Sequence, residues 1–514
     1  MADIICTIGA RAAQAVTIDS VSGTSPGPYT VTLNAAVPGN TKIGDAVVDS
    51  ASAKFLITGV SGNDLTVVKY PFNPATDPAT GAATTRRAFN TTDHANLLQS
   101  WHDAAPASLV TATERWIGEC QNDGLITNAF VDFGAQVKAT DASNYFYLRA
   151  GAGQGFNDHA SKLTNALRYN ASNGVAFRSS TLNGQTSLVT GSSSYLTVEG
   201  IQFQHNAGGS VNSVSGIVWV TRATAKYVNC IFEANGTAIY RGDSTGTNRG
   251  RFINCVMYCT QSGTAGIRAF TDQSADMYNC TVFLFGATSA ACVINASTST
   301  VVKNTIGYAA GSGADFSGTV AAGSTNNVSS DSSAPGSGSL INQTLSTLIT
   351  NDSSFAAFDA KPISATLNVG VRDQTNTADL DILKIGRSTS FPTIGAMEFT
   401  ATITLDISSS AVSEVTADLT VPDKVVSVEL RDDTGAPWAN QLFDWAFYDA
   451  PRIKDAVAPV AKGTASTDEN GLFTVVVNGT ALAVGSVGRL VVGIANTDAA
   501  AQEKSCTRPA VVAA

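Results

Sequence analysis

The chain has 514 residues, of which 31 are Lys or Arg and 41 are Asp or Glu. Charged residues make up 14% of the chain, against about 25% in ordinary globular proteins, which argues against a coiled coil, a solvated helical protein or a charge-rich disordered chain. The formal net charge of -10 removes any general electrostatic reason to bind nucleic acid or an anionic membrane, so we expect neither as a partner.

The sequence shows neither a membrane span nor an export signal. No apolar run approaches the roughly 18 residues that a spanning helix needs. Residues 1–16 lack the basic start and long apolar centre of a secretory signal, so we expect synthesis in a cytoplasm and no export by that route. The eight cysteines form no CxxC pair and only four histidines are present, which predicts no metal site and no cofactor.

The first quarter of the chain divides into two predicted parts. Residues 1–85 alternate strand-like runs with turns rich in Gly, Pro and Asn, and predict a small N-terminal β domain. Residues 86–130 carry the helical pattern, with Thr92 or Asp93 as the expected N-cap. Its apolar residues fall in two stretches: Leu97, Leu98 and Trp101, then Leu109, Thr113 and Trp116. We interpret 86–130 as a helical cap on a repetitive β region, which would otherwise expose strand edges.

The middle of the chain repeats one strand pattern. Tyr227–Phe232, Phe252–Met257 and Met277–Val282 match one another, with a weaker fourth copy at Lys303–Ile306. The shared asparagines recur at one constant interval, at Asn229, Asn254, Asn279 and Asn304. A fixed period without an intervening helix predicts the stacked turns of a parallel β-helix, which we assign to residues 131–400. The Gly- and Ser-rich residues 309–340 are either an exposed loop or an irregular last turn.

Alternation along each copy predicts which side chains face inward. We expect Val228, Cys230 and Phe232 to share one face, and their counterparts in the next two copies to stack on them about 4.8 Å apart. The column Cys230, Cys255 and Cys280 is then a ladder of reduced thiols in the core. Lys303 and its neighbours break this alternation in the fourth copy, which predicts a bulge or a register change there.

The asparagine column has two interpretations. A row of amides could bind sugar hydroxyls, or stacked Asn side chains could hydrogen-bond to one another and satisfy the bends of the backbone. We favour the structural interpretation, because buried polar groups mainly satisfy each other. Residues 401–514 return to alternating strands, about seven in number, which is the size of an immunoglobulin-like β-sandwich. The predicted fold class is therefore all-β.

Two sets of segments carry a resemblance to known proteins. Arg87–Phe89, Leu97–Trp101, Ala104–Pro106 and Trp116–Asp123 resemble the N-terminal cap region of right-handed parallel β-helix proteins encoded by tailed bacteriophages. Ile394–Phe399, following Asn368–Gly370 and Arg387, resembles the closing signature of pectate-lyase-like β-helices, and the C-terminal region is similar to immunoglobulin-like modules of phage virion proteins. The resemblance implies a virion protein that is made in the host cytoplasm and assembles as a homotrimer.

The acids of the repeats are too sparse to predict catalysis. A glycoside hydrolase needs two carboxyl groups roughly 5–10 Å apart. No two of the following acids are placed on adjacent turns of one face, apart from Asp243 and Asp272 in turns of uncertain register: Glu199, Glu233, Asp243, Asp272, Asp276 and Asp315. We therefore expect no catalytic residues. Cys6 and Cys506 lie near the chain ends, which suggests an intermolecular disulfide between assembled subunits.

The expected function is a non-enzymatic bacteriophage structural protein, most simply a trimeric capsid decoration or cement protein that contacts the major capsid protein. The alternative is a tailspike or receptor-binding protein that binds or cleaves host surface polysaccharide. A secreted bacterial adhesin is disfavoured by the missing export signal.

Overall fold

Two compact units divide the chain in the computed structural model: Met1–Ser346 with Asn351–Ala360, and Thr347–Thr350 with Lys361–Ala514. Among the helices that the structure describes, none is long and apolar enough to cross a membrane. Up to residue 399 the structure describes residues 2–127, 131–132, 138–179, 189–191, 195–206, 216–220, 224–235, 238–242, 249–260, 265–268, 274–285, 292–296, 300–311, 313–372, 380–388 and 392–399. Beyond residue 399 it describes Asp468 and the strands β32 to β38.

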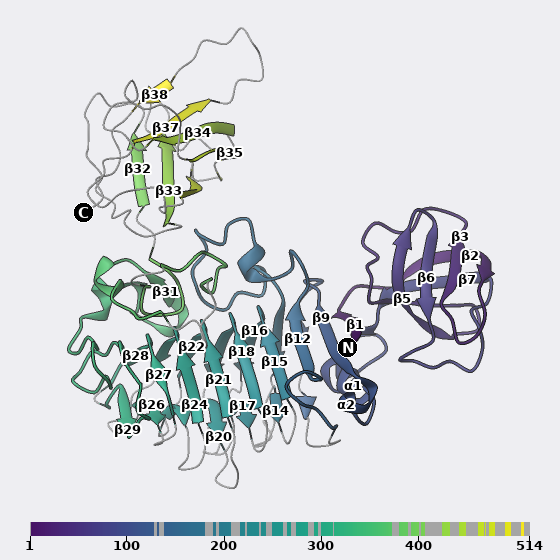
Figure 1. Ribbon diagram of the computed structural model, residues 1–514, viewed down its shortest axis with the longest axis horizontal. Helices are drawn as coiled ribbons and strands as arrows, with labels where there is room; N and C mark the ends of the chain where they lie inside the picture. Colours follow the sequence, from purple (N-terminus) through teal and green to yellow (C-terminus); the bar gives the residue numbers. More distant parts are fainter. Residues whose placement is uncertain are drawn as a thin grey trace. The chain divides into compact units, whose positions relative to one another are not determined.

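A closed six-stranded β-barrel accounts for most of the predicted N-terminal β domain (Figure 1). Its strands pair in the order β2-β3-β6-β5-β4-β7, so that no edge is left open. Alternate side chains such as Tyr29, Val31 and Leu33 point into its own hydrophobic core. The barrel strands are β2 (Gln14–Ser22), β3 (Tyr29–Leu33), β4 (Asp45–Val48), β5 (Lys54–Ser61), β6 (Asp64–Val68) and β7 (Gly81–Arg87).

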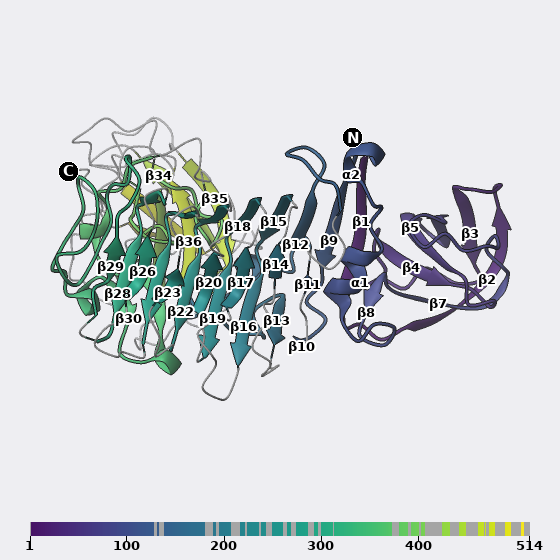
Figure 2. The same cartoon turned by 90° about the horizontal axis from the view of Figure 1, so that it is seen from below.

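Three parallel sheets form the solenoid that follows, and the predicted parallel β-helix is thereby confirmed (Figure 2). Sheet 1 contains β8 (Phe89–Asn90), β1 (Ala2–Gly9), β9 (Glu114–Cys120), β12 (Phe146–Ala150), β15 (Tyr195–Glu199), β18 (Thr224–Val228), β21 (Arg249–Ile253), β24 (Ser274–Tyr278) and β27 (Val302–Lys303). Sheet 2 contains β10 (Ile126–Thr127), β13 (Ala176–Ser179), β16 (Gln202–Asn206), β19 (Ile231–Asn235), β22 (Val256–Cys259), β25 (Thr281–Leu284) and β28 (Ile306–Ala309). Sheet 3 contains β11 (Val131–Asp132), β14 (Val189–Gly191), β17 (Gly216–Val220), β20 (Ala238–Gly242), β23 (Ala265–Arg268), β26 (Cys292–Ala296) and β29 (Phe316–Gly318).

The period of the sequence repeat is the length of one turn of this solenoid. Phe252 pairs with Met277, and Met277 with Val302, across parallel neighbours. Strand β1 is an exception to chain order, because Ala2–Gly9 lies in sheet 1 between β8 and β9 and not in the barrel. Its partner in β9 is distant in the sequence, as the pairing of Ala2 with Glu114 shows.

Each repeated asparagine forms the corner between sheet 1 and sheet 2. Asn229, Asn254, Asn279 and Asn304 all have φ between 50° and 52°, the left-handed region that Gly and Asn tolerate best. Gly200, with φ 69°, lies at the same place one turn earlier, between β15 and β16. The corner therefore demands a residue that accepts positive φ.

This corner also resets the alternation of side chains, so one part of the predicted core is wrong. Tyr227, Cys230 and Phe232 belong to the solenoid core. Val228 lies outside that core and forms a separate cluster with its equivalents Ile253 and Tyr278. The left-handed residue turns the backbone between the two strands, and inward positions are therefore not spaced by two across it.

The fourth copy continues the solenoid without the predicted bulge. Val302 is in the core and pairs with Met277, while the partly exposed Lys303 pairs with Tyr278 in the same register. Gly307 pairs with Val282 in the adjacent strands of sheet 2. Beyond it, bridges join Ile306 to Val328 and Val328 to Leu340, so the Gly- and Ser-rich segment is an irregular continuation of the solenoid.

The two expected helices are present but shorter than the pattern suggested. Helix α1 (Leu97–Asp103) begins after Asn96, whose side chain accepts a hydrogen bond from the Gln99 amide, so the expected caps at Thr92 or Asp93 are wrong. Helix α2 (Leu109–Ala112) follows the N-cap Ser108 and ends at Thr113, which has a left-handed conformation. Trp116 consequently lies in β9, where its indole N–H donates to the Trp101 carbonyl at 2.9 Å.

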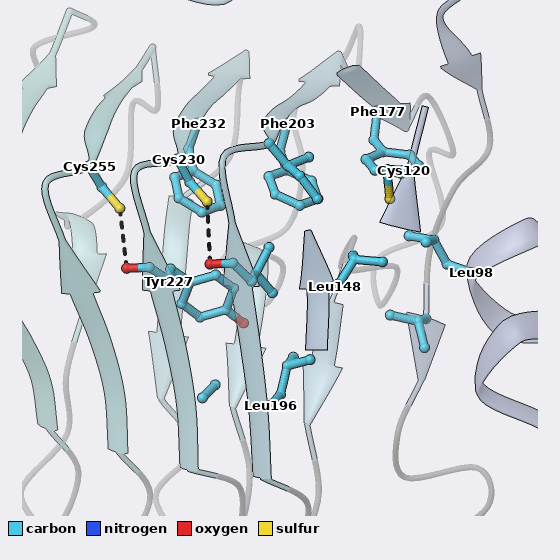
Figure 3. Packing of buried hydrophobic residues seen from close by; sticks show 14 of the residues in the cluster. Leu98, Cys120, Leu148, Phe177, Leu196, Phe203, Tyr227, Cys230, Phe232 and Cys255 are labelled. Atoms are coloured by element: carbon cyan, nitrogen blue, oxygen red, sulfur yellow. Dashed lines mark hydrogen bonds between the residues drawn. The ribbon is translucent and has the colours of Figure 1, made fainter. Parts of the chain in front are cut away.

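One hydrophobic core runs from α1 through the turns of the solenoid. It includes Leu98 of the helix, Leu148 of sheet 1 and a column of phenylalanines in sheet 2 (Figure 3). Phe177, Phe203 and Phe232 stack at centroid distances of 5.8 and 5.3 Å, with no ring exposed to solvent. Like residues stack on like because each pairs in register with its equivalent on the next turn.

The second unit contains a short closing segment, which comprises the described residues of 361–399, and two small sheets. One sheet has the order β32-β33-β36, with β32 parallel to β33, and the other has the order β35-β34-β37-β38 with antiparallel pairs. These strands are β32 (Thr402–Asp406), β33 (Lys424–Arg431), β34 (Leu442–Tyr448), β35 (Ala461–Ser466), β36 (Leu472–Val477), β37 (Arg489–Ile494) and β38 (Ser505–Thr507). Along the chain, the elements that follow β29 and precede β32 are β30 (Ile349–Asn351), β31 (Asp359–Pro362) and the short 3-10 turns Leu345–Thr347, Phe355–Ala357 and Ala365–Leu367. A further 3-10 turn, Phe156–Asp158, precedes β13.

The closing segment brings together the residues that carried the sequence resemblance. The Thr393 hydroxyl donates to Asn368 Oδ1 at 2.6 Å, and Arg387 donates to the carbonyls of Gly395 and Ala396 at 2.9 and 2.8 Å. The Glu398 carboxylate lies 3.5 Å from Arg387 and accepts the Thr393 amide. These polar contacts fix a segment that has little regular secondary structure.

Replacing Glu398 by Gln is expected to change how stability depends on pH. Burial raises the pKa of Glu398 despite the opposing charge of Arg387. A carboxyl whose folded pKa is raised contributes stability that is present below its unfolded pKa of about 4.3 and is lost as the pH rises through the folded pKa. The wild type should therefore lose stability relative to Glu398→Gln as the pH rises above about 4. Thermal unfolding at a series of pH values measures the melting temperatures of both proteins. A wild type that keeps or gains stability relative to the variant as the pH rises would contradict the prediction.

Candidate functional site

The cysteine column lies in the core of the solenoid. Cys230, Cys255 and Cys280 are fully buried free thiols on three successive turns. Each thiol lies within hydrogen-bonding distance of backbone carbonyls, as Cys255 does with Tyr227 O at 3.5 Å (Figure 3). Desolvation raises the pKa of Cys255 well above its usual value, so this thiol stays protonated and is a poor nucleophile.

The two terminal cysteines lie in different environments. Cys6 is a fully buried residue of β1 in the solenoid core, and burial raises the pKa of its thiol to about 12. An intermolecular disulfide would require this side chain to leave the core, which is against that proposal for Cys6. Cys506 is in β38 and pairs with Val492, but its side chain lies outside the described residues.

The asparagine column is tied together by its own amides. Asn254 Nδ2 donates to Asn229 Oδ1 at 3.1 Å, and Asn304 Nδ2 donates to Asn279 Oδ1 at 2.9 Å. All four side chains are at most 5% exposed. The side chains therefore contact one another beneath the surface and are not presented to a ligand.

Replacing Asn254 by Ala is expected to destabilise the solenoid more than replacing it by Gly. Alanine costs about 1–2 kcal/mol in the left-handed region, whereas glycine adopts it without strain. Both variants remove the hydrogen bond to Asn229 Oδ1, so their difference isolates the backbone effect. Urea unfolding of the two variants measures it, and equal midpoints would contradict the prediction.

A column of polar side chains on the outer face of sheet 2 is internally paired. Arg178, Gln204, Glu233 and Tyr258 pair in register on four successive strands. Arg178 donates to Gln204, Gln204 donates to Glu233, and the Tyr258 hydroxyl donates to the same carboxylate. This chain of hydrogen bonds holds neighbouring turns together.

Other segments cover this column. The Tyr169 amide donates to the Tyr258 hydroxyl at 3.0 Å, and the ring of Phe358 lies 4.8 Å from that of Tyr258. Phe358 also lies 4.7 Å from Phe283, the residue that pairs with Tyr258 on the next strand. Glu233 itself is partly buried and is held by Gln204 and Tyr258, so the column has a structural role.

The outer face of sheet 1 is different, because its first turns present aromatic and charged side chains to solvent. Their neighbours Phe146, Leu148, Leu196 and Val198 point into the core, so the intervening residues point outward. We name the outward set the tyrosine–arginine surface. It consists of Arg115, Glu119, Tyr145, Tyr147, Arg149, Tyr195 and Glu199, from β9, β12, β15 and the residue before β12.

The register places these residues side by side on successive turns. Arg149 pairs with Glu119 on one side and with Glu199 on the other. Tyr145 and Tyr147 have ring centroids 6.3 Å apart, and Tyr195 is 38% exposed. At about 4.8 Å per turn, the surface spans roughly 10 Å along the solenoid axis.

Its charges are matched within the surface and at its margin. Arg115 donates two hydrogen bonds to Asp3, at 2.7 and 2.5 Å. Arg149 donates to Glu119 at 3.0 Å, and its guanidinium lies 5.5 Å from the ring of Tyr147. The Tyr147 hydroxyl donates to Glu199, and burial together with this contact raises the pKa of Tyr147.

Sequence patterns alone do not bring two of the carboxylates of this surface together. Glu119 lies in β9, inside the segment interpreted as a helical cap, and a long insertion separates the paired strands β12 and β15. Glu119 and Glu199 flank Arg149 on alternate strands, roughly 10 Å apart by strand spacing, at the upper end of the separation that inverting hydrolases use. Because Arg149 and Tyr147 hold the two acids, the arrangement suits binding more than proton transfer.

No group of three or more His, Cys, Asp or Glu side chains that could hold a metal ion occurs within the described part of the chain. The chain is a parallel β-solenoid protein with an N-terminal six-stranded barrel. No protein-family model matches it. A search of curated proteins finds no relative either.

Proposed function

We propose that this protein is a non-enzymatic structural component of a bacteriophage virion, acting as a homotrimeric capsid decoration protein. The observation that supports a structural role best is the internal pairing of polar columns along the solenoid. Side chains such as Glu233 and Asn254 bond to equivalents on neighbouring turns, and this stiffens the stack. A stiff solenoid is suited to bracing or projecting from a protein shell.

The finer assignment rests on the resemblance found in the sequence. We assign the solenoid to right-handed, pectate-lyase-like β-helices, with which the compact segment around Arg387 and Thr393 agrees. We assign residues 401–514 to an immunoglobulin-like module, and two small sheets of mainly antiparallel strands support that choice. In a decoration protein such a module faces outward, while the remainder contacts the major capsid protein.

Two measurements test this proposal. Light scattering of the purified chain should give three times the mass of one chain, which is 52.9 kDa. A reconstruction of the virus particle that carries the protein should show its density at threefold positions of the capsid. A monomer in solution, or absence of the chain from purified particles, would overturn the proposal.

A receptor-binding protein is the second candidate, because the tyrosine–arginine surface offers exposed aromatic rings beside hydrogen-bonding groups. Aromatic rings pack against the apolar faces of sugars, and Arg and carboxylate groups bond to hydroxyls. Density at the baseplate of the particle, together with binding to host polysaccharide, would favour this candidate. Release of oligosaccharides during incubation would add cleavage to binding.

A further inference from the structure

We infer that the tyrosine–arginine surface binds an uncharged polysaccharide, with the polymer lying across the turns along the solenoid axis. This inference rests on the second candidate function and names its ligand class. It starts from the placement of the three tyrosines, Tyr145, Tyr147 and Tyr195. They lie on two neighbouring turns, on the face of sheet 1 opposite to the core residues Phe146 and Leu196.

The exposed rings provide apolar area in an otherwise polar region. Tyr195 is one of the large residues with more than a third of its surface exposed, at 38%, while Tyr145 and Tyr147 are half-buried. A tyrosine combines a rigid apolar face with a polar tip and loses little conformational freedom on binding. Such rings match a sugar, which has apolar C–H faces and polar edges.

The charges of the surface argue for a neutral ligand. Arg115 is paired with Asp3, and Arg149 with Glu119, while Glu199 accepts a hydrogen bond from Tyr147. Counting Asp3, these five charged groups sum to -1, and the exposed Lys226, which pairs with Thr197 on the next turn, brings the sum to zero, so no excess positive charge remains for an anionic polymer. Half-exposed ion pairs of this kind contribute little to stability. The hydroxyl groups of a sugar can therefore hydrogen-bond to the same arginine and carboxylate groups at low cost.

The direction of the polymer follows from the register. Glu119, Arg149 and Glu199 form one line across three strands, perpendicular to the strands themselves. Tyr147 and Thr197 pair in the neighbouring line, which runs the same way. A polysaccharide that lies along the solenoid axis therefore contacts repeated polar groups on one side and aromatic rings on the other. A polysaccharide that lies along one strand would contact polar groups and aromatic rings only once or twice each.

The test is a glycan array that carries neutral and anionic oligosaccharides side by side, probed with the full-length chain. We expect binding to neutral glycans only. Tyr195→Ala and Tyr147→Ala should each weaken it about tenfold or more. Val60→Ala, which truncates an exposed side chain of the barrel, is the matched control and should bind as the wild type does.

The outcomes separate this inference from the function on which it rests. Binding that is confined to anionic glycans, or that survives both tyrosine variants, overturns the inference while the receptor function stands. Absence of binding to every glycan overturns both. Circular dichroism and thermal unfolding of each variant show whether it is folded, and Tyr147→Phe keeps the ring if Tyr147→Ala does not fold.

Discussion

Replacing Arg87 by Met is expected to destabilise the first compact unit by about 3–5 kcal/mol. Arg87 ends the barrel strand β7 and is 3% exposed. Its guanidinium donates to Asp123, which follows β9, at 2.6 and 2.8 Å, and to both oxygens of Asp45 at 3.1 and 3.2 Å. In the variant the fully buried Asp45 keeps its ion pair with Arg11, at 3.0 Å, but loses the pair with Arg87, and Asp123 loses both of its bonds from Arg87. Removing one partner from a buried ion-pair network is costly.

Arg115→Met is the matched control for this prediction. Arg115 also forms two hydrogen bonds to one aspartate, Asp3, but both side chains are about a third exposed. Solvent screens such a pair, and its loss should cost less than about 1 kcal/mol. Urea unfolding monitored by tryptophan fluorescence compares the two variants. Equal destabilisation would show that burial of the Arg87 network contributes nothing.

The second large effect is expected from Phe232→Ala. The ring of Phe232 is fully buried, stacks on Phe203 at 5.3 Å and meets Tyr227 and Phe252 edge to face. Truncation leaves a cavity in a column whose backbone is fixed by pairing on both sides, so relaxation can fill little of it. We expect a loss of about 3–5 kcal/mol in the free energy of unfolding.

Tyr195→Ala provides the comparison at a position where the side chain points outward and not into the core. It removes a ring of similar size from an exposed position, and surface substitutions usually change stability by less than about 0.5 kcal/mol. The same unfolding experiment measures both variants. A small effect of Phe232→Ala would mean that the turns can collapse around the missing ring, contrary to a close-packed solenoid core.

The repeated turns could be predicted from the sequence because the solenoid imposes one environment on equivalent residues of successive turns. An asparagine recurs at four successive corners between sheets 1 and 2, since few residues accept the positive φ there, and cysteine follows it inside the core at three of them. Such recurrence is visible without coordinates. The fixed interval is lost in the earlier turns, where a long insertion separates the paired residues Phe146 and Leu196, so the register cannot be read from the sequence there.

Two other features could not be predicted, for different physical reasons. The position of Val228 outside the core depends on the bend at Asn229, and strand alternation alone carries no information about a left-handed corner. The juxtaposition of Glu119, Arg149 and Glu199 depends on long-range register, which local patterns do not specify. The tyrosine–arginine surface therefore follows from the pairing of β9, β12 and β15 and not from any local sequence pattern.

The position of β1 within sheet 1 has a consequence for synthesis. Residues 2–9 leave the ribosome before their partners in β8 and β9, which follow only after the whole barrel. The barrel strands can pair with one another during this time, whereas the backbone groups of β1 stay unpaired until β8 and β9 have been made. Pairing of β1 with β9 is thus a late, non-local event, and deletion of residues 2–9 would leave Trp116 and its strand without a neighbour on that side.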